Sequence, residues 1–470
     1  MNDILILLSP FKYKVYIDFL IEIKHYRKQY GSSILEVKNS IRLSLIKSGV
    51  RTDCNFLVRG KSIKAHKLIL GISSPVFEAM FYGPLSSNDD ITITDVEPNI
   101  FKSLLKFIYT DNVKITSIED AFDLMYASRK YILENLTDIC ASYLITNLCI
   151  DNVITILNYP DHMQDKHVAS AAINLFCQHA GYLLTENKAI ITSTCMQKIV
   201  KSPEMNIAEK DLIKHIFEWT TYYCEQNDIP ITLKSRRDAM EKNGIFKYLR
   251  FYSLSTKDTE EIVISNDNLL LTCEIEDIKK FDKSALTINH KLLGLLDKQI
   301  LPRKPIKVAW GDCFRAPIKS KPPIIIDQYN LRVDVKIVSN TSVFINSLNV
   351  PSRTTPVIDY FTPVAKIYCE QFTVTILSEM DCKIIKTIYF KRNVEYDSQI
   401  DIKFDEEILL KKNSQYRISF MWPITYYPHI YAVQKRDTAY INGNVKIFFE
   451  DLFTVTVDGG SFLKGLKHSL

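Results

Sequence analysis

Residues able to do chemistry are few in this chain, and their spacing is not that of a site. Acidic pairs such as Glu260-Glu261 and Glu406-Glu407 are typical of solvated faces. Four potential metal ligands fall in one predicted helical stretch: His162, His167, Cys177 and His179. Their separations of five, ten and two residues match no common zinc pattern, so we do not expect a metal site.

The motifs of common enzyme classes are also missing. The chain has no G-x-x-x-x-G-K-[ST], no G-x-G-x-x-G, no G-x-S-x-G and no H-E-x-x-H. These motifs supply a phosphate cradle, an exposed nucleophile or a pair of zinc ligands, and nothing here replaces them. We therefore expect a protein that is not an enzyme, with no catalytic residue, no metal and no cofactor.

Composition indicates a soluble chain with several domains. The 470 residues are 46% hydrophobic and 24% charged, enough to build more than one core. Net charge is only +5, from 59 basic and 54 acidic residues spread along the chain. A nucleic-acid binder needs a concentrated basic face, so nucleic acid is not an expected partner.

The expected compartment is the reducing interior of a cell. Ten cysteines occur without a C-x-x-C pair, which favours buried, reduced thiols. No convincing signal peptide begins the chain, and no apolar run approaches the roughly 20 residues of a membrane span. We expect no membrane partner and a cytoplasmic location, with the nucleus as an open alternative.

Hydrophobic periodicity divides the chain into three regions. Alternation at Cys54, Phe56 and Val58 predicts a strand that turns at Arg59-Gly60-Lys61, and helices follow. Residues 151–256 are almost free of strand pattern, which predicts an all-α region. After Pro302 the pattern becomes β-rich. The predicted strands are Val333–Val338, Thr341–Leu348, Phe372–Leu377, Ile384–Phe390, Ile400–Phe404, Tyr416–Met421 and Val445–Phe449. Short strands with frequent turns predict an antiparallel sandwich or barrel.

The segment Asp53–Tyr82 resembles the core of the BTB/POZ family. The positions that carry the resemblance are Ala65-His66-Lys67, Leu70, Ser74, Phe77, Met80 and Phe81. It continues through Asp95-Val96-Glu97-Pro98, Phe101, Leu105, Phe107-Ile108-Tyr109-Thr110, Tyr126-Ala127 and Lys130-Tyr131. These fixed offsets cover about 100 residues, so chance is a poor explanation.

Further along, the chain is similar to a subgroup in which BTB and BACK domains precede a PHR-type β-sandwich. The BACK resemblance rests on Asn206–Glu225, Ile229-Pro230-Ile231-Thr232 and Tyr248-Leu249-Arg250-Phe251. The sandwich resemblance rests on Cys313-Phe314-Arg315, Val343–Leu348 and Phe372–Ile376. The glycine-rich stretch of the PHR family is replaced by Asn349-Val350-Pro351-Ser352.

The resemblance implies a multidomain architecture. Its expected parts are an unassigned N-terminal extension (1–33), an α/β BTB domain (34–150), an all-α BACK domain with connector (151–290) and a PHR-like antiparallel β-sandwich (303–460).

The resemblance also implies that two chains pair through the BTB domain. An apolar helical stripe would supply the dimer interface: Ile34, Leu35, Val37, Ile41 and Leu45. The alternative is that this stripe packs on its own domain. Asp53, His66 and Lys67 occupy the family's charged groove, for which internal hydrogen bonding is favoured over peptide binding.

In cullin-binding relatives the partner docks beside the helix matching Pro75–Tyr82. The residues implied here are Phe81, Tyr82, Leu85 and Tyr131. The family's loop carries a hydrophobic-x-acid triplet, whereas Leu85-Ser86-Ser87 lacks the acid and Asp89 and Asp90 follow later.

The function implied is that of a substrate-recognition adaptor for a cullin-3 ubiquitin ligase, acting as a homodimer. One alternative is an interaction scaffold or corepressor-like protein without ligase activity, which the missing acid favours. Another is a decoy that pairs with related BTB proteins. The sequence does not name the substrate.

Overall fold

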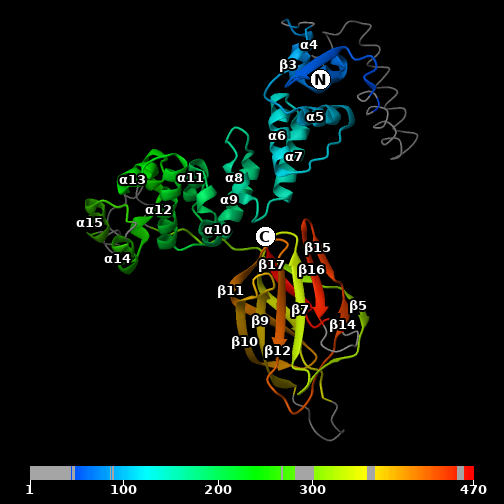
Figure 1. Cartoon of the computed structure of the whole chain (residues 1–470), viewed down its shortest axis with the longest axis vertical. Coiled ribbons are helices and arrows are strands. Elements are labelled where there is room, and N and C mark those ends of the chain that lie inside the picture. Colours follow the sequence, from blue (N-terminus) through cyan, green and yellow to red (C-terminus); the bar gives the residue numbers. More distant parts are fainter. Residues whose placement is uncertain are drawn as a thin grey trace. The chain divides into compact units, whose positions relative to one another are not determined.

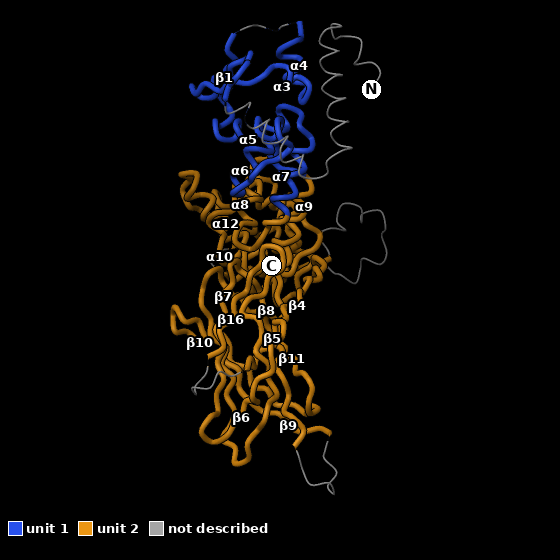
Figure 2. The backbone as a smooth tube through the Cα atoms, turned by 90° about the vertical axis from the view of Figure 1, so that its right-hand side faces the viewer, with its two compact units in different colours: residues 1–145, 161–165 blue, residues 146–160, 166–470 orange. Residues whose placement is uncertain are grey.

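The computed structural model describes residues 44, 48–84, 86, 89–265, 268–280, 301–356, 366–452 and 460–470. They belong to two compact units, which Figure 2 colours separately. Unit 1 comprises residues 1–145 and 161–165, and unit 2 comprises residues 146–160 and 166–470. Each unit is described by itself.

Unit 1 is built on a small sheet in the order β2-β1-β3. Strands β1 (Cys54–Val58) and β2 (Lys61–Ala65) are antiparallel, and β3 (Ile91–Ile93) runs parallel to β1. The predicted turn is confirmed, because Arg59 and Gly60 both adopt the positive φ of a two-residue hairpin. The helices are α3 (Lys67–Ser73), α4 (Pro75–Tyr82), α5 (Pro98–Thr110), α6 (Ile118–Lys130) and α7 (Glu134–Thr146).

The first part of unit 2 is helical, as the sequence predicts. Its α-helices are α8 (Val153–Asn158), α9 (Lys166–Gln178), α10 (Ala180–Asn187), α11 (Ser193–Lys201), α12 (Glu209–Gln226), α13 (Leu233–Lys242), α14 (Thr256–Ile264) and α15 (Thr272–Lys280). Short 3-10 turns lie at Lys188–Ile190, Phe246–Tyr248 and Phe251–Ser253. Helix α12 buries a wide apolar face that includes Leu212, Ile216 and Trp219.

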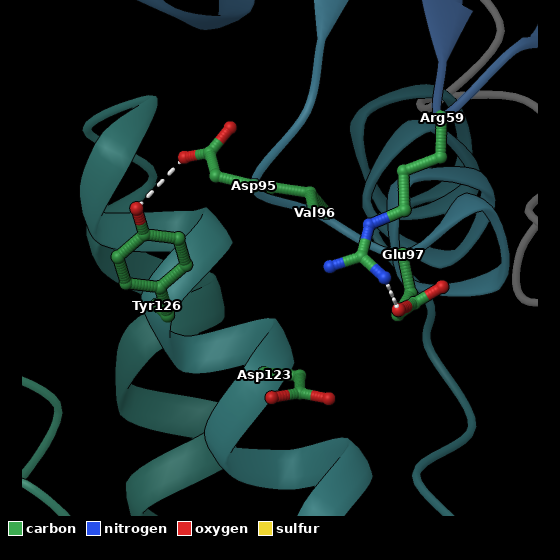
Figure 3. Close-up of a pocket in the computed structure, with 6 residues that line it drawn as sticks. All are labelled: Arg59, Asp95, Val96, Glu97, Asp123 and Tyr126. Atoms are coloured by element: carbon green, nitrogen blue, oxygen red, sulfur yellow. Dashed lines mark hydrogen bonds and ion pairs between the residues drawn. The ribbon is translucent and has the colours of Figure 1, made fainter.

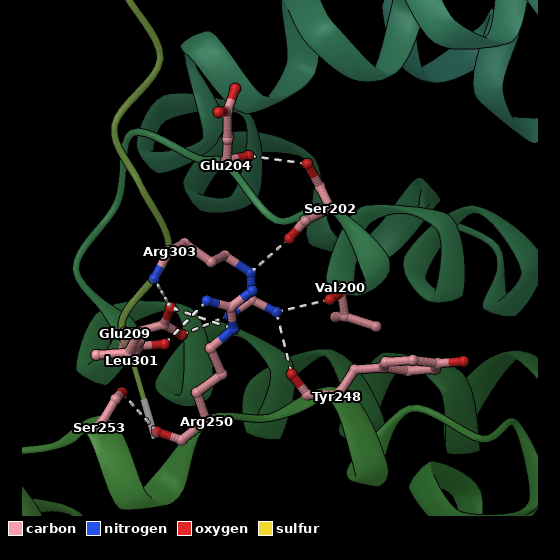
Figure 4. Close-up of polar contacts among 9 residues, drawn as sticks. All are labelled: Val200, Ser202, Glu204, Glu209, Tyr248, Arg250, Ser253, Leu301 and Arg303. Atoms are coloured by element: carbon pink, nitrogen blue, oxygen red, sulfur yellow. Dashed lines mark hydrogen bonds and ion pairs between the residues drawn. The ribbon is translucent and has the colours of Figure 1, made fainter. Parts of the chain in front are cut away.

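Arg303 bonds the segment before the sandwich to these helices, and we call this set of contacts the Arg303 clasp (Figure 4). The buried guanidinium donates to the carboxylate of Glu209 at 2.5 Å and to the carbonyls of Val200, Ser202 and Tyr248. The Arg303 backbone N–H also donates to Glu209, at 2.7 Å. This buried charge therefore has a carboxylate and three carbonyl acceptors, which is what desolvation of a guanidinium requires.

The C-terminal part of unit 2 is a sandwich of two antiparallel sheets (Figure 1). The larger sheet has the order β10-β9-β12-β7-β16-β15, and the smaller has the order β11-β8-β17-β4. Inward side chains of both sheets form one core, including Val335, Ile345, Phe372, Ile418 and Leu466. The antiparallel sandwich predicted from the short β-rich runs is thus confirmed.

Every predicted strand is present, and most are longer than predicted. Their observed bounds are β7 (Arg332–Ser339), β8 (Val343–Pro351), β9 (Ile367–Ser378), β10 (Lys383–Glu395), β11 (Gln399–Leu410), β12 (Gln415–Met421) and β16 (Val445–Leu452). Seven further strands were not predicted. They are β4 (Gly311–Phe314), β5 (Pro317–Ser320), β6 (Ile324–Ile326), β13 (His429–Tyr431), β14 (Gln434–Arg436), β15 (Ala439–Asn442) and β17 (Gly465–Ser469). Strand β17 continues the sandwich past residue 460 and lies between β8 and β4.

Within unit 2, the helical part and the sandwich contact each other directly. The Asp151 carboxylate accepts hydrogen bonds from the Ser342 backbone N–H at 2.9 Å and from its hydroxyl at 2.5 Å. The His179 ring stacks on Phe344 with centroids 4.2 Å apart, and Tyr182 meets the edge of the same phenyl ring. These polar and aromatic contacts lie between the two parts of unit 2.

Replacing Glu209 with Gln should destabilise unit 2, because it leaves the Arg303 guanidinium buried without a counter-charge. We expect a loss of about 3 kcal/mol, at the lower end of the cost of breaking a buried ion pair. The measurement is urea unfolding followed by tryptophan fluorescence, since Trp219, Trp310 and Trp422 all lie in unit 2.

The matched control is Glu406→Gln. Glu406 pairs with Lys386 on the surface with its side chain 83% exposed, so its loss should change stability by less than about 0.5 kcal/mol. Equal urea midpoints for the two variants would contradict a stabilising clasp.

Candidate docking site

Helix α4 rests on a closely packed group of aromatic rings in unit 1. The rings of Phe77 and Tyr131 are stacked, with centroids 4.3 Å apart and planes 13° apart. Phe81 stacks on Phe77 at 6.1 Å, and Phe56 lies edge-on to both. Ring pairs in such geometries contribute about 0.5–1.5 kcal/mol beyond their burial, so the helix has a firm base.

Ser74 joins helix α4 to the end of helix α6. Its buried hydroxyl accepts from the Phe77 backbone N–H at 3.3 Å, which caps the start of α4. The same hydroxyl donates to the Tyr131 carbonyl at 2.6 Å. One side chain therefore fixes the position of α4 against the residue that ends α6.

Helix α6 ends in a Schellman turn with an unusual residue at its left-handed position. The Leu133 N–H donates to the Ser128 carbonyl at 2.8 Å. The Ile132 N–H donates to the Arg129 carbonyl at 3.1 Å. This turn usually has glycine where Ile132 stands, yet Ile132 has a φ of 53°. A β-branched residue is strained in this conformation. Because the Ile132 side chain is 52% exposed, its packing does not offset the strain.

Two large apolar side chains are thus exposed on elements that meet the aromatic base. They are Tyr82, 45% exposed at the end of α4, and Ile132 after α6. Partial burial, followed by the negative charge of Asp53, raises the pKa of Tyr82, so its hydroxyl stays protonated at neutral pH. A rigid base that displays exposed apolar side chains is suited to anchoring a protein partner.

The four residues implied for cullin docking do not share one environment. Tyr82 is exposed, whereas Phe81 and Tyr131 are buried in the aromatic base. Burial in the apolar base raises the pKa of Tyr131 far above its ordinary value. Phe81 and Tyr131 therefore support the surface instead of forming it. Leu85 lies outside the described residues, as do the five residues of the predicted dimer interface: Ile34, Leu35, Val37, Ile41 and Leu45.

The charged group at Asp53, His66 and Lys67 is satisfied by internal hydrogen bonds. The Asp53 carboxylate accepts from the Lys67 backbone N–H at 2.7 Å, at the start of α3. One His66 ring nitrogen lies 2.7 Å from the Tyr109 hydroxyl and the other 3.0 Å from the Val50 carbonyl. Burial raises the pKa of Tyr109 to about 12. The structural role favoured for these three residues over a peptide groove stays a prediction.

A small surface hollow in unit 1 brings charged groups together (Figure 3). It is lined by Arg59, Asp95, Val96, Glu97, Asp123 and Tyr126. Arg59 pairs with Glu97, and Lys130 holds the Asp95 carboxylate at 2.6 Å, which lowers the pKa of Asp95. Burial, then neighbouring acids led by Asp120, raises the pKa of Asp123. The Tyr126 hydroxyl donates to the other oxygen of the Asp95 carboxylate at 2.7 Å.

A family model described as BTB/POZ domain matches residues 44–148. This region of the chain is a BTB/POZ domain. BTB/POZ domains mediate dimerisation and protein binding, and proteins built on them are typically non-catalytic.

Individual relatives match part of the chain. Human BTB/POZ domain-containing protein 3 is 27% identical over 182 residues, which are 38% of this chain and 35% of that protein. BTB/POZ domain-containing protein 6 of Xenopus laevis is 29% identical over 196 residues, 40% of this chain and 37% of its own length. The matches thus span little more than a third of these relatives. A solved chain described as the BTB domain of zebrafish PATZ1 is 24% identical, covers 25% of this chain and 94% of its own, and gives a TM-score of 0.22.

Neither a metal site nor a membrane-spanning helix is found among the residues that the structure describes. No group of three or more His, Cys, Asp or Glu side chains there is placed to hold a metal ion. No helix in the described part of the chain is both long and apolar enough to cross a membrane.

Replacing Ile132 with Gly should stabilise the BTB/POZ domain, because glycine adopts the left-handed conformation without strain. We expect a gain of about 0.5–1 kcal/mol, seen as about twofold to fivefold slower amide exchange in α6 and α7 of the full chain. The matched control is Ile139→Gly in the middle of α7, where glycine should speed exchange. Exchange in the Ile132 variant as fast as in the parent protein would contradict the strain.

Proposed function

We propose that this chain is a non-enzymatic adaptor of a cullin-3 ubiquitin ligase. In this proposal the BTB/POZ domain docks on the cullin, the helical part of unit 2 is a BACK domain, and the PHR-like sandwich captures a protein substrate. The observation that carries it is the pair of exposed side chains, Tyr82 and Ile132, on a base fixed by Ser74 and Tyr131.

The mechanism we propose is proximity. Ubiquitin transfer accelerates when the acceptor lysine is held beside the charged conjugating enzyme, and the adaptor supplies no reacting group. An adaptor of this kind needs a stiff connection between its helical part and the sandwich that binds the substrate. The Asp151–Ser342 hydrogen bonds, the His179–Phe344 stack and the Arg303 clasp support this, since they join the helical part and the sandwich of unit 2.

We also propose that two chains pair through the BTB/POZ domain. Helix α3 exposes Leu68 and Ile72, which are four residues apart and so lie on one face of the helix. An exposed apolar face supports an interface between copies, to which the stripe from Ile34 to Leu45 would add. Pairing would present two sandwiches to a bivalent substrate and raise its effective concentration.

A second candidate is an interaction scaffold without ligase activity, and one contact favours it. The loop after α4 lacks the family's acid at its third position. Asp90, which follows shortly after, could replace that acid only if its carboxylate were available to a partner. Its carboxylate accepts from the Asn55 side chain at 2.8 Å, and Asn55 accepts in turn from Ser62. Asp90 is thereby held against the β1–β2 hairpin, which opposes its use as a docking acid.

Calorimetric titration of the full chain with the N-terminal domain of cullin-3 separates the two candidates. The adaptor proposal predicts sub-micromolar binding that Tyr82→Ser weakens at least about tenfold, as expected for an exposed anchor. Ile132→Ser should weaken binding similarly without unfolding the domain. The matched control is Phe448→Ser, since Phe448 is similarly exposed, at 46%, in the sandwich of unit 2.

Tyr131→Phe adds a second control, because it keeps the ring stacked on Phe77 and should bind like the parent protein. Absence of heat from a folded, dimeric sample would reject the ligase adaptor and leave the scaffold. Equal loss in the Tyr82 and Phe448 variants would show that the docking surface lies elsewhere.

A further inference from the structure

A cluster of large uncharged side chains is exposed at one end of the sandwich. We define the tyrosine tip as Tyr329, Met421, Ile424, Tyr426 and Tyr427. The three tyrosines are 89%, 91% and 82% exposed, and Ile424 is 75% exposed. Isolated exposed apolar residues are common, but several gathered together mark a binding surface.

Strand register brings these residues together from two parts of the chain. Strand β13 pairs with β6 so that His429 lies opposite Ile326. The loop 423–428 before β13 therefore meets the turn 327–330 after β6. The other ends of the loop and the turn are also paired, because Met421 lies opposite Arg332. Beside this pair, the Trp422 N–H donates to the Leu331 carbonyl at 2.9 Å.

A buried polar network holds the loop of the tip from below. The Glu370 carboxylate is fully buried and accepts from the hydroxyls of Tyr368 at 2.7 Å and Tyr431 at 3.0 Å. Arg353 donates to it at 2.8 Å, and the Trp422 indole N–H donates to the Tyr431 hydroxyl at 2.8 Å. Tyr431 and Trp422 flank the loop, so both of its ends are anchored in the core.

The loop itself is also restrained. Pro423 and Pro428 fix two backbone φ angles within it. The Thr425 hydroxyl donates to the Tyr427 carbonyl at 2.7 Å and lies 3.2 Å from a His429 ring nitrogen. Rigid tyrosines lose little conformational entropy on binding, which is why protein-binding loops are rich in them.

The charge of the tip restricts its partner. Within 323–332 and 421–428 the only charged residues are Asp327 and Arg332. Asp327 accepts from the backbone N–H groups of Tyr329 and Asn330, and Arg332 pairs with Asp334 at 2.8 Å. The outward surface thus offers rings, alkyl groups and tyrosine hydroxyls. Apolar side chains of a partner can pack on the rings and alkyl groups. Backbone carbonyls of a non-helical partner segment can accept hydrogen bonds from the tyrosine hydroxyls.

We infer that the tyrosine tip binds an extended, uncharged segment of a partner protein that carries apolar side chains. The inference rests on the proposal that the sandwich captures a protein, and it names the surface and the chemistry of the captured segment. It does not depend on which ligase, if any, the BTB/POZ domain docks on.

Selection of random peptides tests the inference. A phage-displayed dodecapeptide library is selected on the immobilised full chain, and enriched peptides are synthesised and titrated by fluorescence anisotropy. We expect uncharged, apolar peptides whose affinity falls at least about tenfold in the variant Tyr329→Ser/Tyr426→Ser/Tyr427→Ser. Their affinity should change less than about twofold between low and high salt, since no ion pair is screened.

The matched control is Ile441→Ser, which should leave peptide binding unchanged. Ile441 is exposed on β15, whose partner β16 pairs with β7 near Ser339, at the opposite end of that strand from Arg332. Because the three substituted tyrosines are exposed, the melting temperature of the triple variant should equal that of the parent protein.

Enrichment of charged peptides, equal binding by the triple variant or absence of any enrichment would overturn the inference. Light scattering that shows self-association lost only in the triple variant would assign the tip to a second copy of the chain and also overturn it. The titration with cullin-3 does not involve the tip. A negative result in either experiment therefore leaves the conclusion from the other unchanged.

Discussion

The candidate docking surface depends on one hydroxyl group. Ser74 caps helix α4 through the Phe77 N–H and holds the Tyr131 carbonyl at 2.6 Å, so the start of one helix and the end of another share a side chain. Without that bond the carbonyl would be buried and unsatisfied, at a cost of about 1–3 kcal/mol. The stacked rings of Phe77 and Tyr131 then fill the space that the hydrogen bond defines. Exposed Tyr82 and strained Ile132 both depend on this base.

The sequence revealed most of the fold because hydrophobic period and turn residues report local structure. Each long strand of the sandwich appears in the pattern, as does the hairpin at Gly60. The seven strands that it did not reveal have three to five residues each, too few to show an alternation. The partners of most of them are also distant in sequence, as for β17, which pairs with β4 and β8.

The sequence indicates the positions of the candidate docking residues but not their burial. Fixed offsets located Ser74, Phe81 and Tyr131, yet spacing does not say which side chain is buried and which is exposed. The sequence does not indicate the role of Ile132, because glycine usually marks the left-handed end of a helix and no glycine stands here. The Arg303 clasp likewise joins residues 94 positions apart, which no local pattern reports.

The proposed surfaces share a design in which buried polar groups fix exposed apolar ones. Ser74 does this beneath Tyr82 and Ile132, and Glu370 does it beneath the tyrosine tip. Rigid support lowers the entropy lost on binding, so a binding surface gains affinity without new contacts. On this account the chain acts by where it holds its partners.

The most direct test of this account is the mass of the complex in solution. Light scattering coupled to size exclusion, with the full chain and the cullin-3 N-terminal domain mixed at micromolar concentrations, counts the copies of each. The account predicts a single species with two chains and two cullin domains. Elution of the chain at its own mass, with the cullin domain separate, would contradict it.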